Sequence, residues 1–177
     1  MQRIRFKSRF YGFFNESKRR HFIPKLIGDN DNHLYSTADT ILNWSALDDL
    51  SVFVKMDIEG GEYNSLYRFE PFFDKINGFI IEFHDIERNG LEFKTLLSKL
   101  LTQFYIAHVH GNNHAKYIKN TDIPSVLEIT FINKKMMTSS ITLSKRQYPI
   151  KGLDAPNNPY KKDMILKFNN LHHDNTQ

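Results

Sequence analysis

The chain has 177 residues, of which 40% are hydrophobic and 14% aromatic, so it suits one globular domain and leaves little room for two. It contains no cysteine, no apolar run near the roughly 18 residues of a membrane-spanning helix, and no secretory signal, so we expect a cytoplasmic protein without disulfides, thiolate metal sites or a membrane span. The net charge of +4 comes with a cluster of basic residues in the first twenty positions, but because no nucleic-acid-binding motif accompanies the cluster, we expect no nucleic-acid partner.

Strands are predicted where short apolar runs are rich in β-branched and aromatic residues. A weak signal covers Arg3–Phe10, and Phe22–Ile27 is a second weak candidate. Four runs give clearer strand signals, namely Ser51–Asp57, Gly78–His84, Tyr105–His110 and Val126–Asn133.

Helices are predicted between these strands. Asp39–Leu50 suggests a short helix or turn that carries Trp44. A second helix should begin after Gly61 and end near Phe69, because Pro71 lacks an amide and clashes with the preceding turn. Apolar residues at three- and four-residue spacing make Leu91–Phe104 the clearest helix.

Alternation of strands and helices is typical of parallel strands joined by right-handed crossovers. We therefore expect Ser51–Asp57, Gly78–His84 and Tyr105–His110 to run in one direction in one sheet. The segment Gly111–Ser125 has no helical period, so Val126–Asn133 should return antiparallel. Residues 1–137 would form this α/β domain, and residues 138–177 would be a polar tail packing on it.

Polar side chains follow three of the predicted strands, at the edge where open parallel sheets bind ligands. Asp57, Glu59 and Glu62 follow the first strand, and two glycines between them allow a tight turn or a close approach to a ligand. The alternative for Asp57 and Glu59 is turn capping; for Glu62 it is the favourable position of a carboxylate at a helix start.

The second and third strands end in further groups, namely Glu82, His84 and Asp85, and then His108, His110, Asn112 and Asn113. His108 and His110 share one strand face and could chelate a metal with His84 or Asp57. The alternative is a pair of histidines at a partly solvent-exposed strand end, held by backbone hydrogen bonds. We assign no metal ligands, and we expect Asp57, Glu59, His84 and His110 to meet in one cleft.

The segment Lys55-Met-Asp-Ile-Glu-Gly-Gly-Glu-Tyr63 resembles the Lys-(Ile/Met)-Asp-(Ile/Val)-Glu-Gly-(Ala/Gly)-Glu motif of FkbM-type S-adenosylmethionine-dependent methyltransferases. Further resemblance to that family runs through Ile80–His84, His108–Asn113, Pro124–Phe131 and Leu153–Asn158. It implies a Rossmann-like methyltransferase sheet, mostly parallel with an antiparallel last strand. Family members begin with a glycine-rich cofactor turn. Since only Gly12 lies in the first 27 residues, the resemblance implies an amino-terminally truncated member without that segment, and we assign no cofactor-binding residue.

The resemblance implies transfer of a methyl group from S-adenosylmethionine to a hydroxyl, plausibly of a sugar or surface glycan precursor. Catalysis would fall to Asp57, Glu59 and His84, with Asp57 or His84 accepting the proton. The acceptor would contact Glu62, Glu82, His110, Asn112 and Asn113. An exposed sheet edge would favour a homo-oligomer.

Two other functions compete with methyl transfer. A non-catalytic α/β remnant could bind a partner or a glycan, and the missing glycine turn favours that reading. A metal hydrolase would use the same carboxylates and histidines, but the chain lacks a ligand motif such as His-Glu-x-x-His.

Overall fold

A computed structural model describes residues 23–28, 30–44 and 52–167. Within these ranges the chain forms a mixed α/β structure with a four-stranded sheet and three α-helices. The predicted strand Arg3–Phe10 lies outside the described residues.

The main sheet has the order β3-β4-β6-β5. Its strands are β3 (Val52–Met56), β4 (Ile76–Phe83), β5 (Phe104–Gly111) and β6 (Leu127–Asn133). β3 pairs parallel to β4, whereas β6 pairs antiparallel to both β4 and β5. Three strands therefore share one direction and the last strand opposes them, which confirms the predicted strands and their directions.

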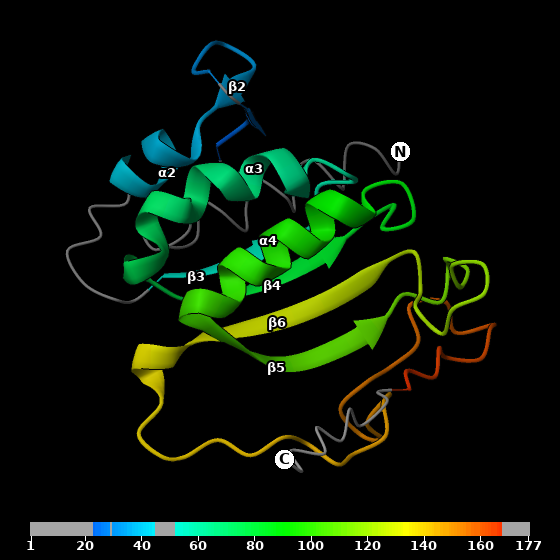
Figure 1. The fold of residues 1–177 in the computed structure, drawn as a ribbon. Helices are drawn as coiled ribbons and strands as arrows, with labels where there is room; N and C mark the ends of the chain where they lie inside the picture. Colours follow the sequence, from blue (N-terminus) through cyan, green and yellow to red (C-terminus); the bar gives the residue numbers. More distant parts are fainter. Residues whose placement is uncertain (1–22, 29, 45–51, 168–177) are drawn as a thin grey trace, which may run out of the picture.

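Two helices cover one face of this sheet (Figure 1). α3 (Glu62–Phe69) buries Tyr63, Leu66 and Phe69, which recur every third residue on one side of the helix. α4 (Gly90–Gln103) lies within one residue of the prediction at each end. A short 3₁₀ helix at Glu70–Lys75 follows α3, with Pro71 in its first turn, where the missing amide is tolerated.

The core lies between these helices and the sheet. Phe79 of β4 and Phe104 of β5 are fully buried, with ring centroids 5.2 Å apart and an angle of 69° between the ring planes. Phe73 contacts both rings in the same edge-to-face manner. Such pairs add about 0.5–1.5 kcal/mol beyond the burial of their area, so the three rings hold β4, β5 and the 3₁₀ helix together.

A smaller unit precedes the sheet. β1 (Leu26–Ile27) pairs parallel to β2 (Tyr35–Ser36), and α2 (Ala38–Trp44) follows. Of the predicted strand Phe22–Ile27, two of the described residues, Leu26 and Ile27, form a strand. The helix expected within Asp39–Leu50 is present as α2, whose last residue is Trp44.

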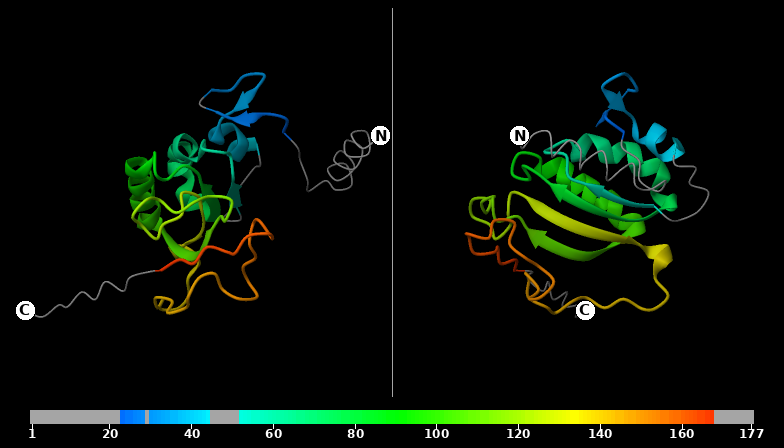
Figure 2. Two further views of the ribbon diagram at one scale, coloured as in Figure 1. Left: turned by 90° about the vertical axis from the view of Figure 1, so that its right-hand side faces the viewer. Right: turned by 180° about the vertical axis from the view of Figure 1, so that it is seen from behind.

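The segment after β6 runs back along β5 (Figures 1 and 2). Tyr148 forms an isolated bridge with Leu166, and both side chains belong to the hydrophobic core. On β5, Val109 faces that core, so the flanking His108 and His110 face the other side of the sheet. Both histidines contact the returning segment there. The division at residue 137 stays a prediction.

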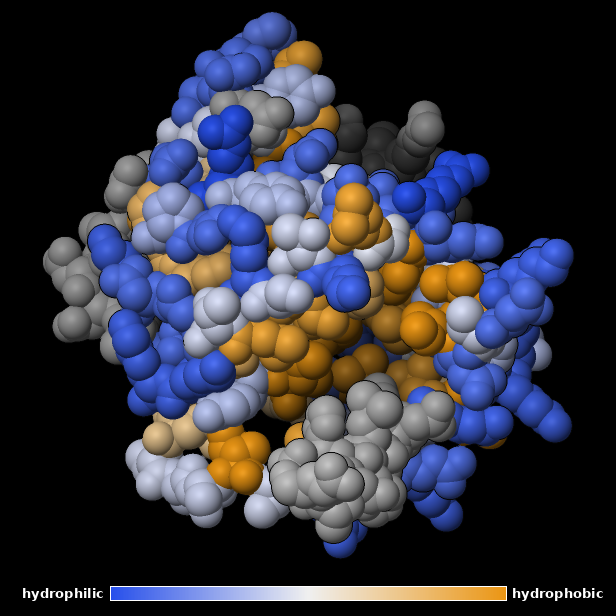
Figure 3. Space-filling model, viewed as in Figure 1, coloured by the Kyte–Doolittle hydropathy of each residue, from blue (hydrophilic) through white to orange (hydrophobic). Residues whose placement is uncertain are grey.

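Apolar side chains also gather on the face that carries α4 (Figure 3). A cavity of about 330 Å³ lies there, lined mainly by Phe93 and Leu97 of α4 and by neighbouring residues of β5 and β6. Among the described residues, no helix is long and apolar enough to cross a membrane. β3 and β5 are the outer strands of the four-stranded sheet, and association through such an edge stays a prediction.

Candidate functional site

The candidate site is built on the turn that joins β3 to α3. Glu59 and Gly60 both have positive φ angles, 55° and 100°, so the chain reverses sharply just after Asp57. Glycine adopts such an angle without strain, whereas Glu59 is a less common residue in this region. The turn presents the side chains of Asp57 and Glu59 at the carboxyl end of β3.

Glu62 stabilises this turn through hydrogen bonds to its backbone. Its side chain is 0% exposed. Its carboxylate accepts hydrogen bonds from the backbone amide of Ile58 at 3.0 Å and from that of Gly60 at 3.0 and 3.3 Å. A third partner is the Nδ1 atom of His84, also at 3.0 Å. Glu62 therefore joins β3, α3 and the end of β4, and its buried position makes it a positioning residue rather than a contact for the acceptor.

His84 follows the last residue of β4 and points toward the turn. Burial of the imidazole lowers its pKa, but the hydrogen bond and negative charge of Glu62, with the charges of Glu82 and Glu59, outweigh burial and raise the pKa of His84 above its ordinary value. Because the Glu62 carboxylate accepts at Nδ1, that nitrogen carries a proton. The other ring nitrogen, Nε2, faces Asp57 and Glu59.

The distances define a compact group of two carboxylates and one imidazole. Nε2 of His84 lies 3.6 Å from Glu59 Oε2 and 3.9 Å from Asp57 Oδ1. One ligand atom from each residue lies within 4.8 Å of the others. The side chains of His84, Asp57 and Glu59 are 15%, 40% and 88% exposed, so the group lies at the surface with its imidazole largely covered.

Tyr63 is a residue that the sequence prediction did not single out. Its hydroxyl donates a hydrogen bond of 2.7 Å to the carbonyl oxygen of His84. Burial, with the charge of Glu62, raises the pKa of Tyr63, so the phenol remains a neutral donor. Tyr63 lies next to Glu62 in the motif, but the contact spans 21 positions and leaves no local signal.

The remaining predicted residues lie farther along the sheet. Glu82 of β4 is buried and accepts a 2.6 Å hydrogen bond from the Asn112 side chain. The side-chain oxygen of Asn112 also accepts a hydrogen bond from the backbone amide of His114. Glu82 and Asn112 form a polar pair on the sheet face opposite α3 and α4, because the neighbours of Glu82 along β4, Ile81 and Phe83, belong to the core.

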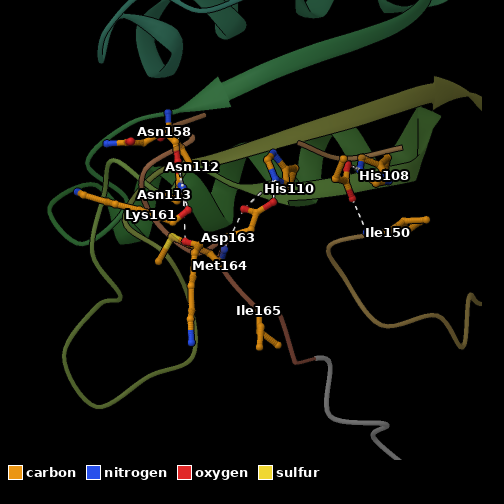
Figure 4. Close-up of polar contacts among 12 residues, drawn as sticks. His108, His110, Asn112, Asn113, Ile150, Asn158, Lys161, Asp163, Met164 and Ile165 are labelled. Atoms are coloured by element: carbon orange, nitrogen blue, oxygen red, sulfur yellow. Dashed lines mark hydrogen bonds and ion pairs between the residues drawn. The ribbon is translucent and has the colours of Figure 1, made fainter. Parts of the chain in front are cut away.

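His110 and Asn113 are occupied by the carboxyl-terminal segment (Figure 4). Nε2 of His110 lies 3.1 Å from both carboxylate oxygens of Asp163. Asn113 exchanges hydrogen bonds with the backbone of Asn158, at 2.6 and 2.9 Å. Of the four side chains expected in one cleft, the structure groups Asp57, Glu59 and His84, and it gives His110 a different partner.

His108 is held in the same way. Its Nε2 lies 2.7 Å from Asp154 Oδ1, while the second oxygen of Asp154 accepts the backbone amide of Ile150. Asp154 and Asp163 lie in the segment predicted as a polar tail, and neither was singled out from sequence. Both histidines therefore have side-chain carboxylate partners in the described structure, rather than the backbone partners that the second interpretation expected.

Comparison with known proteins does not extend this picture, since no protein-family model, curated protein or solved structure matches the chain.

Proposed function

We propose that this chain transfers a methyl group from S-adenosylmethionine to a hydroxyl of a sugar or surface glycan precursor. The observation that carries the proposal is the convergence of Asp57, Glu59 and His84 at the carboxyl ends of two parallel strands. The motif resemblance at Lys55–Tyr63 and the antiparallel last strand, β6, support the same class.

The three side chains suit the activation of a hydroxyl. A hydroxyl that binds between them can donate its proton toward Asp57 or toward Nε2 of His84, which makes its oxygen more nucleophilic. Glu62 and Tyr63 fix the imidazole ring and the His84 backbone, so little reorganisation is needed. Glu59, being highly exposed, can hydrogen-bond a second hydroxyl of the acceptor.

The described residues do not by themselves fit the methyl donor. A turn that binds the carboxylate of the methyl donor would offer free backbone amides. Here the Gly60 amide is bound by Glu62 and the Gly61 amide by the carbonyl of Ile58. The site groups are two carboxylates and an imidazole, which suit hydroxyls and cations rather than the carboxylate of the donor.

Replacing Asp57 tests the proposal. The full chain would be incubated with S-adenosylmethionine and a panel of sugars, and formation of S-adenosylhomocysteine would be measured. Asp57→Asn should lower turnover by about 100-fold or more, the usual contribution of a general base. Because Asp57 is 40% exposed, the melting temperature should barely change.

Glu87→Gln is the matched control, since Glu87 is an exposed acid on the loop after β4 and should leave turnover unchanged. Full activity of Asp57→Asn would contradict the assigned role. Absence of product with every acceptor tested would contradict the methyl-transfer proposal itself.

The occupied amides of the Asp57–Gly61 turn favour one alternative, a non-catalytic module that binds a glycan or a partner. Such a module would bind sugars at the same carboxylates but would not bind the methyl donor. Titration calorimetry with S-adenosylmethionine separates the two: heat of binding supports the enzyme, and its absence alongside sugar binding supports the module.

A further inference from the structure

We infer that Asp57, Glu59 and His84 form a binding site for one divalent metal cation. The three side chains supply two different types of metal ligand. Two carboxylate oxygens and one imidazole nitrogen lie within 4.8 Å of one another, and they come from the ends of two adjacent strands rather than from a run of surface acids. Carboxylate and imidazole together suit first-row divalent cations such as Mn²⁺.

Glu62 lies outside the ligand group and orients its imidazole. Histidines that bind a metal through one nitrogen usually donate the other N–H to a carboxylate, which fixes the tautomer and ring orientation. Glu62 is fully buried and accepts at Nδ1 of His84 at 3.0 Å, while backbone amides of the turn hold its carboxylate in place. Glu62 therefore aims Nε2 at the other two carboxylates.

The spacing between the ligand atoms also suits a bound cation. The Nε2 distances of 3.6 and 3.9 Å exceed the usual 2.7–3.2 Å range of hydrogen bonds to nitrogen. Two ligand atoms that each lie about 2.1 Å from one ion are separated by at most about 4.2 Å, so both distances fit a shared cation. Glu59 is 88% exposed, and a small rotation of its side chain can bring the whole group within that limit.

The cation would have a role in the proposed function, and this part of the inference rests on that function. A cation held by three protein groups keeps open positions for water or for a hydroxyl of the acceptor. Bound to the ion, the hydroxyl would lie beside Asp57 and would lose its proton more readily. Cation binding itself requires neither the methyl donor nor the acceptor.

Mn²⁺ is the probe for the test. The full chain would be titrated with MnCl₂ in the absence of other ligands, and free Mn²⁺ would be measured by electron paramagnetic resonance. We expect saturation at one ion per chain. Glu59→Gln should weaken binding by about tenfold or more, on the scale of losses at metal sites. Because Glu59 is exposed, this variant should retain the fold.

Glu87→Gln is again the matched control and should bind Mn²⁺ with unchanged affinity. Electron spin-echo envelope modulation on the Mn²⁺-loaded wild-type chain should show coupling to an imidazole nitrogen, which we assign to His84. Lack of saturation, equal affinity in Glu59→Gln and wild type, or absence of nitrogen coupling would each overturn the site. Undiminished methyl transfer in excess chelator would overturn the catalytic role, whereas Mn²⁺ binding without any methyl transfer would support the site and count only against the proposed function.

Discussion

Glu62 is the residue on which the geometry of the site depends. Its buried carboxylate accepts from two backbone amides and from His84, and hydrogen bonds to charged groups contribute about 1.5–3 kcal/mol each. Glu62→Gln keeps the shape but replaces one acceptor oxygen by a donor. We expect a loss of unfolding free energy on the order of 2–4 kcal/mol, measured by urea denaturation.

A carboxylate at a helix start can also stabilise through the helix dipole, which contributes about 0.3–1 kcal/mol at exposed positions. Glu92 is an exposed acid in the first turn of α4, so Glu92→Gln isolates that effect. Its loss should stay below about 1 kcal/mol. Equal losses in the two variants would mean that Glu62 acts through the dipole alone.

His84 makes stability depend on pH in a defined direction. Burial lowers the pKa of His84, but Glu62 and the nearby acids raise it more, so the folded pKa lies above the ordinary 6.5 of the unfolded chain. The contribution is complete below about pH 6.5 and is lost as the pH rises through the folded pKa. The unfolding free energies of wild type and His84→Asn, measured in chelator from pH 5.5 to 9, should converge as the pH rises. Divergence toward high pH would contradict this.

At the scale of elements, the strands of the main sheet could be predicted from short apolar runs rich in β-branched and aromatic residues. α4 could be predicted because its apolar residues recur on one side, and α3 because Gly61 precedes it and Pro71 limits it. The direction of β6 followed from the lack of a helical crossover before it. No local signal in the sequence predicted that β6 lies between β4 and β5. In the structure alternate residues of β6 are buried, whereas much of β5 is exposed, as expected of a strand at the edge of the sheet.

The candidate site was predictable only in part, for a related reason. Asp57, Glu59 and His84 could be grouped because adjacent parallel strands end at the same edge. The partners of His110 and Asn113 could not be predicted, because Asp163 and Asn158 lie 53 and 45 positions away in an irregular segment. Contacts of that kind depend on the tertiary fold, which brings the carboxyl-terminal segment back to β5.

At the scale of the molecule, the segment from Tyr148 to Leu166 is fastened to β5 and to the loop that follows it. His108 binds Asp154, His110 binds Asp163, and the Tyr117 hydroxyl bonds both the amide and the carbonyl of Ile165. These contacts cover the sheet face opposite α3 and α4 along its outer strand. The segment therefore acts as part of the folded unit, and its attachment can be weakened without touching Asp57 or its neighbours.

Asp163→Asn tests this attachment, because it removes a charge-assisted contact to His110. Losing about 1.4 kcal/mol would make local opening roughly tenfold more frequent. We expect hydrogen exchange of the amides from 158 to 166 to accelerate by about that factor, while amides of β4 keep their protection. Asp74→Asn is the control, since Asp74 is an exposed acid in the 3₁₀ helix after α3 and should leave exchange in this segment unchanged. If exchange near residue 163 is the same in both variants, the histidine–aspartate pair does not hold the segment, and the burial of Met164 and Leu166 must do so instead.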